Sequence, residues 1–327
     1  MSNLHPGQTS QIASPRQGAI EFLLSRAAAG VWRDYNMGGT ESDEWVTAYV
    51  AHALAETTLD EARHAASTAW DQLKQLASTH GPGLGYNRLT PQDADSSAWA
   101  VRLARIIGKS YDDFARGCLN YVRSHVLGAG GIATYTAASL LKAGVGDSEA
   151  AVAGWIAPHF CISATAAYIP EIGGSLKICE YLANKQDQDG RWRSYWWHDD
   201  EYATALAIES LARSGDYQES MRKAALWLSA RTATSSAFVI ALCVLGLRKA
   251  GCSAWREFLP ELLSLQSEDG SWPASARMRM PPPDLVDPRT RWRWDKHSNG
   301  IGCVMADWNR IFTTATVLRA LTACHND

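Results

Sequence analysis

The chain carries the segment Gln186-Asp187-Gln188-Asp189-Gly190-Arg191-Trp192, and the same pattern returns in Gln266-Ser267-Glu268-Asp269-Gly270-Ser271-Trp272. Each segment lies between two stretches whose apolar residues recur at helical spacing. Glycine tolerates the positive φ of a tight turn, and the tryptophan behind it can stack over the neighbouring helix. The two segments therefore predict structural turns that join the helices of a repeated unit.

Around these turns the sequence repeats an outer helix, a turn that often contains glycine and an aromatic residue, and an inner helix rich in Ala and Leu. Outer helices are expected near 19–29, 61–78, 111 onward, 174–185, 217 onward and 257–265. Inner helices are expected near 44–54, 93–107, 161–169, 202–214, up to 250, and 311–324. The third pair contains an extra helical segment, and the fifth lacks the glycine–aromatic turn.

Each unit of such an array buries its apolar face only against its neighbours, so about six pairs favour closure into a toroid. We therefore predict an all-α protein, an (α/α)6 barrel. A single domain is expected over residues 16–327, after a flexible segment at 1–15.

The inner helices share a hydroxyl residue followed by alanine near their start, and this pair aligns the repeats at Thr47, Ser97, Thr204, Ser236 and Thr314. Four places earlier stand Asp43, Asp93, Asp200, Thr232 and Arg310, where an N-cap is expected. Two places earlier stand Trp45, Asp95, Tyr202, Thr234 and Phe312. Asp93 thus fits the scaffold, whereas Asp95 is a carboxyl at a position that mostly carries aromatic residues.

Composition and charge limit the possible functions. The chain is 46% hydrophobic and 20% charged, which is ordinary for a globular protein. Its net charge of −3 and scattered arginines give no footprint for nucleic acid or for a charged membrane surface. The sequence has no signal-peptide core and no apolar run long enough for a transmembrane segment. Seven cysteines without a CxxC pair predict reduced thiols, and we expect a cytoplasmic protein.

The two turn segments resemble the repeated motif of squalene–hopene-type terpene cyclases and of protein prenyltransferase β subunits, and the resemblance spans most of the chain. It implies an (α/α)6 barrel with a central cavity, like the β domain of the class II cyclases. Those enzymes carry a DxDD-type signature whose middle Asp protonates an alkene or epoxide. The matching segment here is Asp93-Ala94-Asp95-Ser96-Ser97-Ala98, so Asp95 takes the middle place and Ser96 replaces the last Asp.

The resemblance therefore implies a class II-like terpene or meroterpenoid cyclase of secondary metabolism, an enzyme that starts cyclisation of an isoprenoid chain by proton transfer from Asp95. This chemistry requires a buried, neutral carboxyl in a cavity that excludes water, and aromatic faces that stabilise a carbocation. Asp93, His198 and His297 are the further candidate catalytic residues, and His159 is a weaker one. The candidate substrate-binding residues are Trp45, Ser96, Trp99, Trp197, Tyr202, Trp292, Trp294, Trp308 and Phe312. The long connection 281–310 is expected to form a lid.

Other chemistries lack their motifs. The prenyltransferase zinc ligands are missing, because the last inner helix starts Ile311-Phe312-Thr313-Thr314 and no Asp-x-Cys pair occurs. The DDxxD motif of class I synthases, the P-loop and the dinucleotide fingerprint are also missing. We expect no metal and no cofactor, and the expected partner is a small isoprenoid or prenylated molecule.

Two questions stay open at the level of sequence. Familiar class II cyclases enclose their substrate between two barrels, so the loops of this chain, a second barrel subunit or a homo-oligomer would have to cover the cavity. The alternatives to a cyclase are a non-catalytic barrel that binds an isoprenoid or a protein partner, with Asp95 as a helix-end carboxylate, and another acid-catalysed rearrangement on the same scaffold.

Overall fold

The computed structural model describes residues 14–77, 81–173, 177–231 and 234–325. Inner helices are α2 (Glu44–Ala55), α4 (Ala94–Ile106), α7 (Phe160–Ala167), α10 (Glu201–Ser214), α12 (Ala237–Lys249) and α14 (Ile311–His325). Outer helices are α1 (Pro15–Arg26), α3 (Asp60–Ala77), α5 (Asp113–Ser124), α9 (Ile178–Asn184), α11 (Gln218–Ser229) and α13 (Trp255–Ser264).

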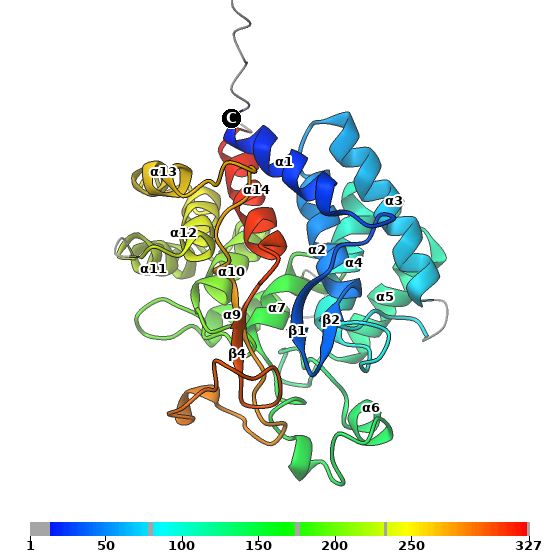
Figure 1. The fold of residues 1–327 in the computed structure, drawn as a ribbon. Coiled ribbons are helices and arrows are strands. Elements are labelled where there is room, and N and C mark those ends of the chain that lie inside the picture. Colours follow the sequence, from blue (N-terminus) through cyan, green and yellow to red (C-terminus); the bar gives the residue numbers. More distant parts are fainter. Residues whose placement is uncertain (1–13, 78–80, 174–176, 232–233, 326–327) are drawn as a thin grey trace, which may run out of the picture.

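The inner helices form a closed ring. Each packs against the next along the chain, and α14 packs against α2, while the outer helices lie around this ring (Figure 1). The predicted all-α barrel is therefore confirmed. None of the helices in the described ranges has the length and apolarity that crossing a bilayer requires.

The connections add short elements at one end of the barrel, where the inner helices begin (Figure 1). The extra segment of the third pair is α6 (Ala137–Lys142) and the 3₁₀ turn η1 (Ala150–Val152). The short helix α8 (Pro170–Gly173) lies at the opposite end of the barrel, after the end of α7. Strands β1 (Asp34–Met37) and β2 (Thr40–Ser42) form one antiparallel pair, and β3 (Arg277–Arg279) and β4 (Val304–Ala306) form another. The 3₁₀ turn η2 (Pro288–Thr290) lies in the long connection. The strands were not predicted, because pieces this short carry no readable alternation.

The hydroxyl residue that aligns the repeats has one shared task. Thr47, Thr204 and Thr314 accept hydrogen bonds from the backbone N–H groups of Trp32, Trp192 and Trp272, at 2.9, 3.1 and 3.2 Å. Ser97 accepts in the same way from Leu84, and Ser163 from Ile132. In every case the donor lies in the turn before the inner helix. The side chain at the fourth place of an inner helix therefore fixes that turn against the helix.

The structure corrects the alignment of the fifth repeat. Helix α12 begins at Ala237, so Ser236 is its N-cap and accepts from the backbone N–H of Val239. The residue equivalent to Asp95 is thus Phe238 rather than Thr234, and Thr232 lies outside the described residues. This repeat has no glycine–aromatic turn for a hydroxyl to hold, which explains why the fourth place of α12 is Ile240.

The two glycine turns hold successive units together. Gly190 and Gly270 adopt φ of 98° and 83°, and a Cβ at either would collide with the backbone of Lys223 or Gly18. Gln266 donates to the carbonyl oxygens of Gly270 and Pro15, at 3.0 and 2.9 Å. The second turn therefore binds the last outer helix to the start of the first one, which helps to close the ring.

The hydroxyl contact gives a testable prediction. Replacing Thr204 by Val leaves the buried backbone N–H of Trp192 without a partner, and we expect this to lower the free energy of unfolding by about 1–3 kcal/mol. Thr204→Ser keeps the hydroxyl and is expected to lose much less. Denaturant unfolding of both variants measures the difference, and equal stability of Thr204→Val and the unaltered protein would contradict this explanation of the repeat.

Candidate active site

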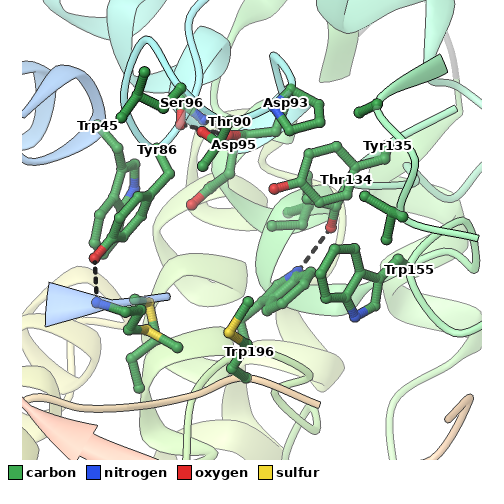
Figure 2. A pocket seen from close by; sticks show the side chains of 18 of the residues that line it. Trp45, Tyr86, Thr90, Asp93, Asp95, Ser96, Thr134, Tyr135, Trp155 and Trp196 are labelled. Atoms are coloured by element: carbon green, nitrogen blue, oxygen red, sulfur yellow. Dashed lines mark hydrogen bonds between the residues drawn. The ribbon is translucent and has the colours of Figure 1, made fainter. Parts of the chain in front are cut away.

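A cavity of about 320 Å³ opens at the end of the barrel where the inner helices begin (Figure 2). Its wall is mainly aromatic and aliphatic, and it contains two carboxyl groups. The lining residues are Met37, Trp45, Tyr86, Leu89, Thr90, Pro91, Asp93, Asp95, Ser96, Thr134, Tyr135, Ala143, Val145, Trp155, Ile162, Trp196, Trp197, Met278 and Met280.

Asp95 is the second residue of α4 and only 9% of it is exposed. Its Oδ1 atom is buried and has no hydrogen-bond partner. Burial raises the pKa of Asp95 to about 7, although the Thr165 hydroxyl, the Trp45 indole N–H and the charge of Arg102 act in the opposite direction. A carboxyl in this environment keeps its proton at a pH where an exposed one is fully ionised.

Asp93 is the N-cap of α4, as the sequence predicts. One of its oxygens accepts from the backbone N–H of Ser96 and the other from the Ser96 hydroxyl, both at 2.7 Å. Burial, together with the nearby carboxyl of Asp95, raises the pKa of Asp93 to about 8. Ser96 therefore holds Asp93, while Asp95 remains free to face the cavity.

The cavity ends where aromatic side chains meet on the barrel axis. Trp45 and Trp197 line it, with ring centroids 5.9 Å apart. Behind them, Phe312 stacks on Trp45 at 4.7 Å, and Tyr202 and Phe238 stack on Trp197 at 4.3 and 5.0 Å. The second residues of the inner helices converge at this level, so the rings among them pack on one another and close the barrel beside Asp95.

This packing corrects part of the expected lining. Trp45, Ser96 and Trp197 lie on the cavity wall together with Asp93 and Asp95. Tyr202 and Phe312 are fully buried in the ring stack behind it. Trp99 lies deeper, with its ring against Tyr49 at 4.6 Å and under the guanidinium of Arg102. Trp99 lies one turn after Asp95, and because the inner helices run parallel to the barrel axis, that turn places it farther from the cavity.

The aromatic residues of the long connection also lie away from the cavity. Trp292 and Trp308 are 89% and 59% exposed, and the guanidinium groups of Arg279 and Arg291 lie 5.7 and 5.4 Å from the ring centroid of Trp294. The neighbouring segment before this connection does line the cavity, through Met278 of β3 and through Met280, which directly follows β3. The expected tryptophan lid is therefore replaced by methionines.

The candidate histidines do not contact Asp95. The His198 ring lies beside Asp199 at 3.2 Å, and His297 is exposed, with its backbone N–H on Asp295. His159 is buried, but its ring nitrogens bond to Thr134 and to the carbonyl of Gly154. His198 and His297 lie in loops and His159 lies just ahead of an inner helix, and neither position determines where a side chain points.

Sequence reasoning missed several lining residues that come from connections rather than from inner helices. Tyr86, Thr134, Tyr135, Trp155 and Trp196 form much of the wall in Figure 2. The available signal was the density of aromatic residues around the glycines at 130–131 and in the run 195–197. In the described part of the chain, no group of three or more His, Cys, Asp or Glu side chains has the geometry to hold a metal ion.

Comparison with solved structures shows the family to which the chain belongs. The type II terpene cyclase MstE from Scytonema is 32% identical, with a TM-score of 0.86 over 94% of this chain and 96% of that one. A protein from Actinoplanes is 31% identical, with a TM-score of 0.87 over 95% of this chain and 98% of that one. The chain belongs to the type II terpene cyclases. No protein-family model and no curated protein sequence matches it.

As a type II terpene cyclase, the protein is an enzyme that cyclises isoprenoid chains. Structures of MstE with geranylgeranyl dihydroxybenzoate as its substrate and with merosterolic acid A as its product superpose on this chain with TM-scores of 0.87. The ent-copalyl diphosphate synthase from Streptomyces platensis, 17% identical with a TM-score of 0.58, shares the fold, but this chain covers 50% of it. The one-barrel arrangement found here is thus matched by MstE over nearly its full length.

The burial of Asp95 predicts how stability depends on pH. The pKa of Asp95 is raised on folding, so the folded state keeps a proton that the unfolded state loses, and the free energy of unfolding falls as pH rises from about 4 to about 7. Asp95→Asn removes this contribution. The variant is therefore expected to gain stability relative to the unaltered protein as pH rises, by up to about 4 kcal/mol.

Denaturant unfolding of both proteins at a series of pH values measures this difference. The other buried carboxyl groups are present in both proteins and cancel in the comparison, except for Asp93, because Asp95→Asn removes a charge that raises the pKa of Asp93. If the stability of Asp95→Asn relative to the unaltered protein stays constant or falls as pH rises, Asp95 is ionised in the folded state.

Proposed function

We propose that this enzyme is a meroterpenoid cyclase in which Asp95 protonates the terminal alkene or epoxide of a prenyl chain carried by an aromatic head group. The observation that carries the proposal is the buried Asp95 carboxyl, with a pKa near 7 and an unpartnered oxygen, on the wall of an aromatic-lined cavity. The substrate class rests on the 31% identity to MstE in its complex with geranylgeranyl dihydroxybenzoate.

In the first step, the Asp95 O–H bond breaks and its proton forms a C–H bond with the terminal alkene, or an O–H bond with an epoxide. With an alkene, the π electrons form the new C–H bond and leave a tertiary cation on the other carbon. With an epoxide, the C–O bond breaks, its electrons stay on the oxygen, and the carbon becomes the tertiary cation. The next double bond of the chain attacks this cation and closes a ring. Loss of a proton ends the sequence, so the product is an isomer of the substrate. A proton returned to Asp95 completes the cycle.

The developing carboxylate of Asp95 needs stabilisation when its proton leaves. The Thr165 hydroxyl, the Trp45 indole N–H and the charge of Arg102 favour the ionised form. Before the reaction the Thr165 hydroxyl donates to the carbonyl oxygen of Cys161 and the Trp45 indole N–H has no hydrogen-bond partner, so both groups can turn toward the carboxylate as it forms. The cavity thus combines burial that retains the proton with donors that stabilise its loss.

The wall around Asp95 suits a hydrocarbon that becomes cationic. Trp45, Tyr135 and Trp196 offer ring faces, and each cation–π contact contributes about 0.5–2 kcal/mol. Met37, Met278 and Met280 form an apolar, deformable side that can adapt to a folded prenyl chain. The polar head group would then occupy the open end.

The described cysteines are all unpaired, which fits the reducing cytoplasm that we propose as the site of this secondary metabolism.

The acid role of Asp95 is tested by Asp95→Asn, which keeps the shape of the side chain and removes its acidic proton. We expect loss of cyclised product, by at least about a thousandfold, from a panel of prenylated hydroxybenzoates and prenyl diphosphates followed by mass spectrometry. Asp43→Asn is the matched control, because Asp43 precedes α2 as Asp93 precedes α4 but does not line the cavity. An Asp95→Asn variant that still cyclises would overturn the proposal.

The pH dependence of the rate is a separate test. Since the reaction requires protonated Asp95, kcat/KM is expected to be level below about pH 6 and to fall about tenfold per unit above about pH 7–8. Asp43→Asn should keep this profile. A rate that rises with pH over the same range would show that the essential group acts as a base.

A further inference from the structure

Trp196 is held in the cavity wall by a chain of hydrogen bonds that runs away from the cavity. Its indole N–H donates to the Thr134 hydroxyl at 2.8 Å. That hydroxyl is also 2.7 Å from Nδ1 of His159, and Nε2 of His159 is 2.9 Å from the carbonyl oxygen of Gly154. Trp196 and Thr134 line the cavity, as Figure 2 shows, whereas His159 and Gly154 lie behind them.

The direction of every bond in this chain is determined. A carbonyl oxygen only accepts, so Nε2 of His159 carries the hydrogen and donates to Gly154. Burial lowers the pKa of His159 to about 3, so its ring is neutral and Nδ1 is an acceptor. The Thr134 hydroxyl must therefore donate to His159, which leaves its oxygen to accept from Trp196. Trp196 only donates and the carbonyl of Gly154 only accepts, whereas Thr134 and His159 each donate one hydrogen bond and accept one.

The chain is anchored at both ends. The backbone carbonyl of Thr134 accepts from the N–H of Ala94, the residue directly before Asp95. At the other end, the N–H of Gly154 donates to the carbonyl of Pro283, in the long connection after β3. The His159 ring stacks on Tyr195 at 3.7 Å with an interplanar angle of 13°, and the Tyr195 hydroxyl donates to Leu285. Trp196 is thus fixed relative to the helix that carries the acid.

We propose that Thr134 and His159 are positioning residues that keep the face of Trp196 directed at the cationic intermediates and increase its electron density. The proposal rests on the function proposed above. An indole that donates its N–H to an oxygen gains electron density in the ring, and successive hydrogen bonds polarise one another in the same direction. A cation bound over the ring is then held more strongly, because the attraction depends on the negative ring face.

The neutral state of His159 suits this role. A protonated imidazole would place a positive charge behind the wall that receives the carbocation, and it would deprive the Thr134 hydroxyl of its acceptor. The Thr134 oxygen would then have to accept from both the imidazole and the indole N–H, and its own hydrogen would have no acceptor. A buried ring that resists protonation keeps the chain in one direction throughout the reaction.

Thr134→Val tests the proposal, because Val retains the shape of Thr but accepts no hydrogen bond. We expect kcat to fall about tenfold with KM changed less than about twofold, and partially cyclised products to accumulate. Thr134→Ser restores the hydroxyl and is expected to restore the product profile. His159→Phe keeps the stacking on Tyr195, and its effect should lie between those of the other two variants.

A double-mutant cycle separates positioning from general support of the fold. Trp196→Phe removes the N–H but leaves a ring, so Thr134→Val should have no further effect on kcat in that background if Thr134 acts through Trp196. An equal loss in both backgrounds would overturn the proposal, and so would a Thr134→Val enzyme with the kcat and products of the unaltered one.

A readout independent of turnover distinguishes this proposal from the proposed function. The indole N–H resonance of Trp196, assigned by its absence in Trp196→Phe, should exchange slowly with solvent in the unaltered protein and in Thr134→Ser. It should shift and exchange faster in Thr134→Val. An unchanged resonance overturns the positioning role and leaves the proposed function standing. A failure of the unaltered protein to cyclise any substrate of the panel overturns the proposed function, and with it the role of Trp196 toward a carbocation.

Discussion

One constraint underlies the whole site: the second side chains of the inner helices meet near the barrel axis, where they are buried. Trp45, Cys161, Tyr202, Phe238 and Phe312 occupy five of these places and Asp95 the sixth. A carboxyl at this level cannot ionise without a large cost in desolvation. The same convergence that closes the barrel with stacked rings therefore supplies Asp95 with a retained proton and supplies the cavity with its floor.

The charges deeper in the barrel keep this region electrically balanced. Arg102 and Arg319 bind the two oxygens of Glu209 at 2.7 and 2.8 Å, and Arg319 also binds Glu56. Two cations thus face two carboxylates. Proton transfer from Asp95 to a neutral substrate creates a carboxylate and a carbocation together, so the cavity keeps its net charge. A buried carboxyl with an unpartnered oxygen weakens the fold, and this is a common cost of a site prepared for reaction.

The sequence was most informative where local rules determine the structure. The helix boundaries, the role of Asp93 as a cap and the closure of the barrel followed from repeat spacing and capping chemistry. The register of the fifth repeat failed because Ser236 imitates the hydroxyl–alanine signal while acting as a cap. The cavity wall was harder to predict. Trp155 and Met278 reach it from connections, and the exposed Trp292 does not, because loop placement depends on contacts between distant segments.

The central claim is that Asp95 is protonated in the folded enzyme. Infrared difference spectroscopy of the unaltered protein against Asp95→Asn at about pH 6 tests it directly, since the protonated and ionised carboxyl absorb at different frequencies. We expect the difference spectrum to contain the C=O band of a protonated carboxylic acid. Carboxylate bands in its place would show that Asp95 is ionised in the folded enzyme and is not the proton donor.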